Sequence, residues 1–340
     1  MPHFKGLTLR PPIEAMEARQ VATIPEGAQW IYEPKWDGFR CVAFRDGDEV
    51  ELESKSGQSL TRYFPEIVEG LKRAEDVRFV TDGELMITDG AVADFDALLQ
   101  RIHPAASRVA RLAKETPATY VLFDLLEDGA SNLSSEPLRR RHVALERFIA
   151  NNFAKNATIA LSPATDDPDL ARQWLSGSLA RLDGVIAKRD VAYAFGSRDA
   201  VVKIKRKYTA DCVVGGFRRA KDGAIASLLL GLYDEAGSLH HVGFVGSMSA
   251  QERSRAAEKL ESIVQPPGFT GSAPGGPSRW NRGEESPWFP VAPKCVVEVS
   301  FDHVTGHRFR HATRLLRWRP DKAPRQCTME QLLEPRATES

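Results

Sequence analysis

The sequence is short of cysteine, of long apolar runs and of excess charge. Its four cysteines, Cys41, Cys212, Cys295 and Cys327, lie far apart and lack the paired spacing of a zinc site or a disulfide framework. No stretch approaches the roughly 18 consecutive apolar residues that a membrane-spanning helix needs. The first residues also lack the apolar segment of a signal peptide. These absences predict a soluble chain in a reducing cytoplasm, without a membrane partner.

The net charge is zero, with 46 Lys and Arg against 46 Asp and Glu, so the total charge does not point to nucleic acid. The cations are nevertheless concentrated in two segments. Four of the five residues in 203–207 are Lys or Arg, and six cations lie between Arg308 and Lys322, both included. Because phosphate binding depends on where cations sit, both segments are candidates for it. Solvated charged faces are the alternative.

The length of 340 residues suits two domains rather than one. The first two thirds mix strand and helix patterns and predict an α+β domain. Residues 28–60 predict antiparallel strands joined by tight turns. Helical periodicity is found at 64–75, 95–101 and 138–151. Further strands are predicted at 78–80, 120–123 and 184–187.

After about residue 208 the pattern changes to short β segments separated by turns. They lie at 212–217, 227–233, 240–245 and 295–301, with one helical stretch at 250–263. About five strands and one helix suit a small closed barrel of the OB type. Residues 266–277 contain four prolines and four glycines and predict a long surface loop. The sequence therefore predicts two domains, 1–208 and 209–340.

The strongest local signal is the spacing K-x-D-G-x-R formed by Lys35, Asp37, Gly38 and Arg40. On equal residue frequencies, four fixed residues would match by chance in a chain of this length about two times in a thousand. The spacing gathers an amine, a carboxylate and a guanidinium around a glycine turn between strands. A lysine that gives up its proton is a nucleophile. A β-turn with a surface lysine is the alternative for this segment alone.

Six further short motifs follow in a fixed order. They are SKSG at 54–57, DGE at 82–84, FD at 123–124, DGVIAK at 183–188, VKIK at 202–205 and RWRPDK at 317–322. With them the chain resembles, from about residue 11 to residue 330, the covalent nucleotidyltransferases, which include ATP-dependent DNA ligases, RNA ligases and mRNA capping enzymes. The stretches 99–104, 183–189 and 308–321 resemble in particular the compact bacterial ligases of the DNA ligase C group.

The resemblance implies a fold and a reaction. Residues 1–208 would be an adenylation domain with mixed, mostly antiparallel sheets of the ATP-grasp-like ligase type, and 209–340 an OB-fold β-barrel. Lys35 would attack the α-phosphate of ATP to form lysyl-AMP, and Asp37 would organise the 3′-hydroxyl end of a DNA nick. Lys203 and Lys205 would bind the α-phosphate, since residues one alternation apart on a strand face the same side.

The resemblance also implies how the nucleotide is held. Glu33 would accept a hydrogen bond from the adenine amino group, and Phe123 would stack on the adenine ring. Contacts to the ribose or to the phosphates of AMP and the nick are implied for Arg40, Lys55 and Arg198. Lys55 stands where many relatives have arginine, which replaces a bidentate phosphate contact with a point charge.

A metal ion and a mobile barrel complete the implied mechanism. Glu84 and Asp183 would hold Mg²⁺, for which Mn²⁺ can substitute, because a hard cation prefers oxygen ligands. Glu84 would also lie near the ribose hydroxyls, and Asp183 stands where many DNA ligases have glutamate. Arg319 and Lys322 would orient the departing pyrophosphate when the barrel closes over the site.

The resemblance implies two substrates, ATP and nicked duplex DNA, and an enzyme that seals the nick as a monomer. It also implies a role in DNA repair, with repair proteins as further partners, and a location at the nucleoid of a bacterium. Two alternatives stay open from the sequence. The first is an enzyme for RNA ends or RNA/DNA hybrids, or a capping guanylyltransferase, which the 308–322 segment fits less well. The second is a non-catalytic DNA-binding scaffold of the same fold, against which Lys35, Glu84, Asp183, Lys203 and Lys205 argue. NAD⁺ as adenylate donor is not expected, because only 34 residues precede Lys35 and no zinc spacing follows the barrel segment.

Overall fold

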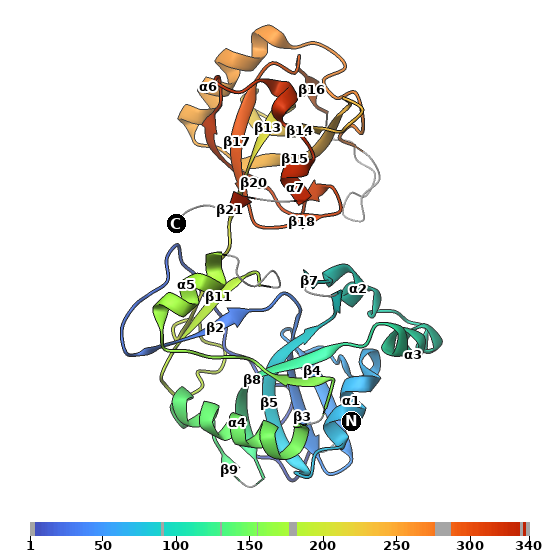
Figure 1. The fold of residues 1–340 in the computed structure, drawn as a ribbon, viewed down its shortest axis with the longest axis vertical. Helices are drawn as coiled ribbons and strands as arrows, with labels where there is room; N and C mark the ends of the chain where they lie inside the picture. The colour runs from blue at the N-terminus through green and yellow to red at the C-terminus, as the bar shows by residue number, and fades with distance from the viewer. Residues whose placement is uncertain are drawn as a thin grey trace. The chain divides into compact units, whose positions relative to one another are not determined.

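The computed structural model describes residues 4–89, 92–129, 131–154, 156–176, 182–275, 287–333 and 336–337. The chain divides into two compact units, Met1–Lys205 and Arg206–Ser340 (Figure 1). The sequence-based boundary at 208 lies three residues later, at the first residue of strand β13 (Tyr208–Arg219). No helix in the described part of the chain has both the length and the apolar character to cross a membrane.

The first unit is built on two sheets. One has the strand order β10-β8-β5-β3-β4, with β9 paired to β8, and the other has the order β1-β12-β11-β2. The strands of the larger sheet are β3 (Phe39–Asp46), β4 (Glu49–Ser54), β5 (Arg78–Met86), β8 (Thr119–Asp128), β9 (Ser131–Asn132) and β10 (Ile159–Leu161). Those of the smaller sheet are β1 (Arg19–Gln20), β2 (Trp30–Lys35), β11 (Gly184–Arg189) and β12 (Val201–Lys205). Most neighbouring strands are antiparallel, and β10–β8 and β1–β12 are parallel pairs.

Helices cover the outer faces of these sheets. Helix α1 (Pro65–Lys72) and helix α4 (Leu138–Phe153) pack against the larger sheet through Ile67, Leu71 and Phe148. Helix α5 (Pro168–Ser176) packs against the smaller sheet through Ala171 and Trp174. The remaining elements are the β6 (Thr88–Asp89) and β7 (Val92–Ala93) pair, α2 (Phe95–Gln100) and α3 (Ala106–Glu115). The two inner faces of the sheets meet and enclose the site described below.

The sequence predicted part of this arrangement and missed part. Strands β3 and β4 form the expected hairpin around Gly47, but the expectation that the strand before Lys35 pairs with its neighbour in sequence is wrong. Strand β2 pairs with β11, about 150 residues further along the chain. Helices α3 and α5 were not predicted. Helix α3 buries only Val109 of its ten residues.

The second unit is a closed barrel, as the sequence predicted. Its strands run β14-β15-β20-β17-β13, and the additional pairing of β13 with β14 closes the ring. The strands are β13, β14 (Ile225–Tyr233), β15 (Leu239–Ser247), β17 (Val296–Phe301) and β20 (Thr313–Trp318). Helix α6 (Ala250–Leu260) begins at a capping box formed by Ser249 and Glu252. The fifth strand, β20, lies inside the basic segment, where arginines mask the strand pattern.

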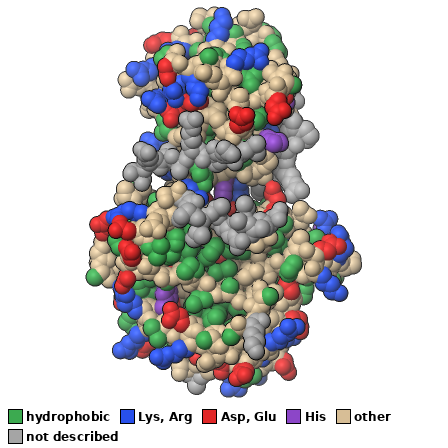
Figure 2. All heavy atoms as spheres, in the orientation of Figure 1, with side chains coloured by type: hydrophobic (Ala, Val, Ile, Leu, Met, Phe, Trp, Pro, Cys, Tyr) green, Lys and Arg blue, Asp and Glu red, His purple; other side chains and the backbone are tan. Residues whose placement is uncertain are grey.

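Shorter elements of the second unit are β16 (Phe289–Pro290), β18 (Val304–Thr305), β19 (Arg308–Phe309), α7 (Glu330–Leu333) and β21 (Arg336–Ala337), together with short 3₁₀ turns. The predicted surface loop at 266–277 is described only as far as residue 275, and residues 276 and 277 lie outside the described part. On the face of each unit seen in Figure 2, side chains of Lys and Arg are interspersed with those of Asp and Glu. Charges of the two signs are therefore mixed on this face of each unit.

His241 makes the second unit sensitive to acid. Its ring is buried, and Arg308 donates a 2.8 Å hydrogen bond to Nδ1. Burial, followed by the charges of Arg308 and Arg218, lowers the pKa of His241 to about 3 from 6.5. The unfolded chain therefore takes up a proton below pH 6.5 while the folded chain does not, so stability falls as the pH falls from 6.5 towards 3.

Replacing His241 by glutamine should remove this pH dependence. Between pH 7 and pH 5 the wild type should lose about 2 kcal/mol more free energy of unfolding than His241→Gln. Urea denaturation of both proteins at a series of pH values measures the difference. If the free energy of unfolding changes with pH in the same way for both proteins, His241 is not neutral in the folded chain.

Candidate active site

The segment around Lys35 passes from one sheet to the other. Strand β2 of the smaller sheet ends at Lys35, and β3 of the larger sheet begins at Phe39. Gly38 lies in the crossing, where a Cβ atom would stand 2.1 Å from the carbonyl oxygen of Leu85. Only glycine allows this close approach. The glycine of the motif is therefore explained by packing against the neighbouring strand rather than by a turn within one hairpin.

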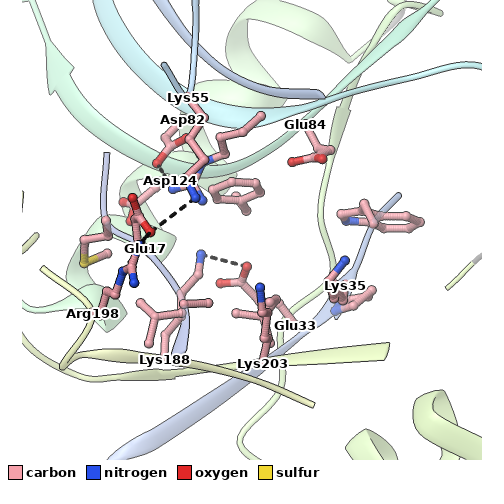
Figure 3. Close-up of a pocket in the computed structure, with 18 residues that line it drawn as sticks. Glu17, Glu33, Lys35, Lys55, Asp82, Glu84, Asp124, Lys188, Arg198 and Lys203 are labelled. Atoms are coloured by element: carbon pink, nitrogen blue, oxygen red, sulfur yellow. Dashed lines mark hydrogen bonds and ion pairs between the residues drawn. The ribbon is translucent and has the colours of Figure 1, made fainter. Parts of the chain in front are cut away.

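A cavity of about 370 Å³ lies between the two sheets, beside Lys35 (Figure 3). This volume lies in the range of small-molecule sites in proteins. Strands of both sheets line it, so side chains far apart in sequence meet there. The predicted site residues among its lining are Glu33, Lys35, Arg40, Lys55, Glu84, Phe123, Arg198 and Lys203.

Three more predicted residues lie next to this lining. Asp183 forms an ion pair with Lys35, and the Asp183 side chain is almost fully buried. The charge of Asp37 acts on Glu84, and that of Lys205 acts on Lys203. Gly184 follows Asp183 and stands opposite Lys35 in the pairing of β11 with β2. This register is what brings Asp183 to the nucleophile candidate.

Cations gather around Lys203 on β12. Burial lowers the pKa of Lys203, and the charges of Lys35, Lys205 and Lys55 lower it further. The amines of these four lysines therefore share one region and repel one another, and the charge of Asp183 offsets part of this repulsion. A bound anion such as a phosphate would relieve this repulsion.

Arg40 is held firmly at the wall of the cavity. Asp82, which is fully buried, accepts hydrogen bonds from Arg40 Nε at 2.6 Å and from Arg40 Nη2 at 2.5 Å. The hydroxyl of Tyr193 donates a further hydrogen bond to Asp82 at 2.6 Å. The guanidinium of Arg40 also lies 4.7 Å from the centre of the Phe123 ring. Because Asp82 fixes Arg40 and Arg40 packs against Phe123, the ring of Phe123 is held in place before a ligand binds.

Glu84 lies where acidic groups crowd together. Burial raises the pKa of Glu84 to about 7, against the opposing charges of Arg40 and Lys35. The nearby carboxylates of Asp82 and Asp37 raise it further. Glu84 is in the interior of β5, so the glutamate of the DGE motif is a strand residue rather than a turn residue. A carboxyl group in this setting would be stabilised in its charged form by a bound cation.

Several lining residues were not predicted as site residues, and Glu17 and Lys188 are two of them. Glu17 accepts contacts from Lys55 at 3.2 Å and from Arg198 at 2.7 Å, so it links two predicted phosphate contacts at the rim. Lys188 ends the DGVIAK motif and forms an ion pair with Glu33 at 2.8 Å. The motif gave a signal for Lys188, but nothing in the sequence around Glu17 marks it.

Arg319 and Lys322 belong to the second unit, where one acidic residue holds them both. Asp211 is buried and accepts contacts from Arg319 Nη1 at 2.9 Å and from Lys322 Nζ at 2.6 Å. Asp321 also contacts Arg319, at 2.8 Å. The two cations of the RWRPDK motif are therefore neighbours in space with a shared partner.

A more open hollow of about 990 Å³ adjoins the cavity and shares Glu17, Arg40, Lys55 and Glu84 with it. Its other lining residues bring hydroxyl groups, one amide and several apolar or aromatic side chains. They are Gly38, Phe39, Ser54, Ser56, Gln58, Ser59, Leu60, Tyr63 and Ile102. The hollow offers room for a second, larger group next to whatever occupies the cavity.

Comparison with known families gives two matches. The profile described as "ATP dependent DNA ligase domain" matches residues 12–205, more than half of the chain. The profile described as "ATP dependent DNA ligase C terminal region" matches residues 221–322. The two matches fall in the first and second units respectively.

Individual relatives are similar over nearly the whole chain. The chain is 43% identical over 347 residues to DNA ligase C2 of Mycolicibacterium smegmatis, covering 97% of this chain and 96% of the relative. It is 43% identical over 345 residues to DNA ligase C of Mycobacterium tuberculosis, with the same coverage. A solved structure from a study of Lig E DNA ligases matches with a TM-score of 0.50 at 18% identity, covering 89% of this chain and 100% of that one, which supports the fold alone.

Proposed function

This chain belongs to the ATP-dependent DNA ligases, and from that premise we propose which residues carry out each step. We propose residues 1–208 as the adenylation domain and residues 209–340 as the OB-fold domain. The single observation that carries the proposal is the cavity beside Lys35. It combines an aromatic surface and an acid, Phe123 and Glu33, with phosphate-binding cations such as Lys203.

In the first step Lys35 Nζ, having lost a proton, attacks the α-phosphorus of ATP. An N–P bond forms, the bond between that phosphorus and the bridging oxygen breaks, and pyrophosphate leaves. The contact between Lys35 and Asp183 holds the amine in place. Lys203 and Lys205 stabilise the charge that develops on the phosphate oxygens. Arg319 and Lys322 orient the pyrophosphate.

The next two steps transfer AMP and seal the nick. An oxygen of the 5′-phosphate at the nick attacks the phosphorus of lysyl-AMP, the N–P bond breaks and Lys35 regains its proton. The 3′-hydroxyl oxygen, organised by Asp37, then attacks the 5′-phosphate, and AMP leaves. We place the end of the DNA in the open hollow next to the cavity, because Arg40, Lys55 and Glu84 border both.

The nucleotide is held by residues of both sheets. Phe123 stacks on adenine, while Glu33 accepts a hydrogen bond from its amino group. Arg40, Lys55 and Arg198 contact the ribose or the phosphates of AMP and of the nick. All five of these residues line the cavity, which supports their assignment to one ligand.

Glu84 and Asp183 are the residues that would hold Mg²⁺, or Mn²⁺ in its place. Their oxygen donors suit a hard divalent cation, and the raised pKa of Glu84, caused by burial and by Asp82 and Asp37, fits a position that gains from a nearby cation. When bound, the ion supplies positive charge to the phosphate oxygens.

We also propose that the chain acts in DNA repair as a monomer able to work beside other repair proteins.

The wild-type chain should seal a 5′-phosphate/3′-hydroxyl nick in duplex DNA with ATP and fail with GTP or NAD⁺. A panel of labelled duplexes with DNA, 3′-ribonucleotide and all-RNA ends at the nick separates the substrates on a denaturing gel. Sealing of RNA ends much faster than DNA ends would favour the RNA-ligase alternative. Binding of nicked DNA without any sealing would favour the non-catalytic scaffold.

A further inference from the structure

Glu33, at the floor of the cavity, has a basic partner for each of its two carboxylate oxygens. Lys188 Nζ lies 2.8 Å from Oε2, and His142 Nε2 lies 3.0 Å from Oε1. Glu33 and Lys188 point toward one another in Figure 3. Their side chains are 3% and 6% exposed, and that of His142 is 15% exposed. Among the described residues, neither nitrogen atom makes a hydrogen bond to any group besides Glu33.

Three separate elements bring these residues together. Glu33 is on β2, Lys188 is on the adjacent strand β11, and His142 is on helix α4. The helix is fixed at this point by Arg141, whose guanidinium pairs with the buried carboxylate of Asp124 at 2.7 Å. His142 does not line the cavity, so it acts on Glu33 from behind.

The two partners keep Glu33 ionised although it is buried. Burial alone would raise the pKa of Glu33, but the charge of Lys188 and the side-chain contact from His142 Nε2 more than offset this and leave the pKa below its ordinary value. Lys188 is also fixed by the ring of Phe123, 4.2 Å from its Nζ. An ionised carboxylate only accepts hydrogen bonds, whereas a protonated one also donates.

We propose that His142 is a specificity-determining residue that, together with Lys188, holds Glu33 as an acceptor-only carboxylate and so restricts the cavity to purine nucleotides with an amino group at C6. This inference rests on the proposed function, in which Glu33 meets the base. Adenine offers Glu33 an N–H donor. A base with a carbonyl oxygen at C6 would instead place an acceptor against the carboxylate, which leaves two buried groups unpaired.

Inosine triphosphate tests this proposal, because hypoxanthine carries a carbonyl oxygen at C6 and lacks the amino group of guanine. The measured quantity is the second-order rate constant for labelling of the protein by ATP divided by that for labelling by inosine triphosphate. In His142→Leu this ratio should fall by at least about tenfold, because the inosine nucleotide no longer meets the full penalty, of about that factor, for leaving a buried polar group unpaired. The ratio does not depend on how much of a preparation is folded, so partial unfolding does not disturb it.

Two variants act as controls on the same helix. His142→Gln keeps an N–H donor at the position and should retain most of the wild-type preference for ATP. Glu146→Leu makes the same polar-to-leucine change one turn further along α4, at an exposed side chain, and should leave the ratio unchanged. A purely structural role of residue 142 would alter labelling by both nucleotides equally.

The outcomes separate this inference from the proposed function. If ATP labels the wild type but the ratio in His142→Leu equals the wild-type ratio, the role of His142 is overturned while the ligase assignment stands. An equal fall in His142→Gln and His142→Leu overturns the donor role in the same way. If ATP labels no residue of the wild type, the proposed function fails and the inference fails with it.

Discussion

Replacing Lys35 by alanine should abolish the transfer of AMP to the protein, slowing it at least about 1,000-fold, because the new bond forms to Lys35 Nζ. The wild type incubated with ATP and Mg²⁺ should gain the mass of one AMP. As a phosphoramidate, the adduct should resist base and be cleaved by acid. Intact-protein mass spectrometry before and after each treatment measures both properties.

The structure supplies a matched control for this substitution. Lys35→Ala removes the cation that is paired with the nearly buried carboxylate of Asp183, and removing one partner of a buried ion pair destabilises a protein. Lys35→Arg keeps a positive charge beside Asp183 but offers a guanidinium that does not lose its proton. Both variants should lack the adduct, while Lys35→Arg stays as stable as the wild type. AMP attached to another residue in Lys35→Arg would contradict the assignment of Lys35.

Removing Arg319 and Lys322 together should block the first step and spare the last. If both residues act only on the departing pyrophosphate, self-adenylylation by ATP should fall at least about 100-fold, the usual loss for groups that stabilise developing charge. Sealing of a nick that already carries AMP on its 5′-phosphate should continue, because Lys35, Asp37 and Glu84 are unchanged. The two assays are run side by side on the Arg319→Ala, Lys322→Ala protein.

The experiment needs a control for Asp211, which forms ion pairs with both substituted residues. The double substitution leaves Asp211 buried without either cation, which would destabilise the barrel whatever the catalytic role. Adding Asp211→Asn removes the unpaired charge, and Asp211→Asn alone shows what its loss does by itself. Low salt and saturating protein prevent weak DNA binding from imitating a catalytic defect. Equal loss in both assays for the triple variant would rule out a role confined to pyrophosphate release.

The order of short motifs in the sequence was enough to identify the family and the fold. The spacing of Lys35, Asp37, Gly38 and Arg40 is local, so it could be read without knowing what these residues touch. The change of pattern after residue 208 likewise predicted the barrel, because period-2 patterning and turn residues act over a few positions. Strand β20 was not predicted, because its arginines obscure the alternation of apolar and polar residues.

The tertiary structure alone decided which side chains face each other across the site. The pairing of β2 with β11 joins residues about 150 positions apart and brings Asp183 to Lys35. The position of helix α4 brings His142 to Glu33. The motifs assigned Lys35 and Asp183 to one site without pairing them, and no motif marked His142, since contacts between different elements are set by the packing of the sheets and helices. The sequence by itself determined the reaction class, and the long-range packing determined the charge and orientation of the groups that serve it.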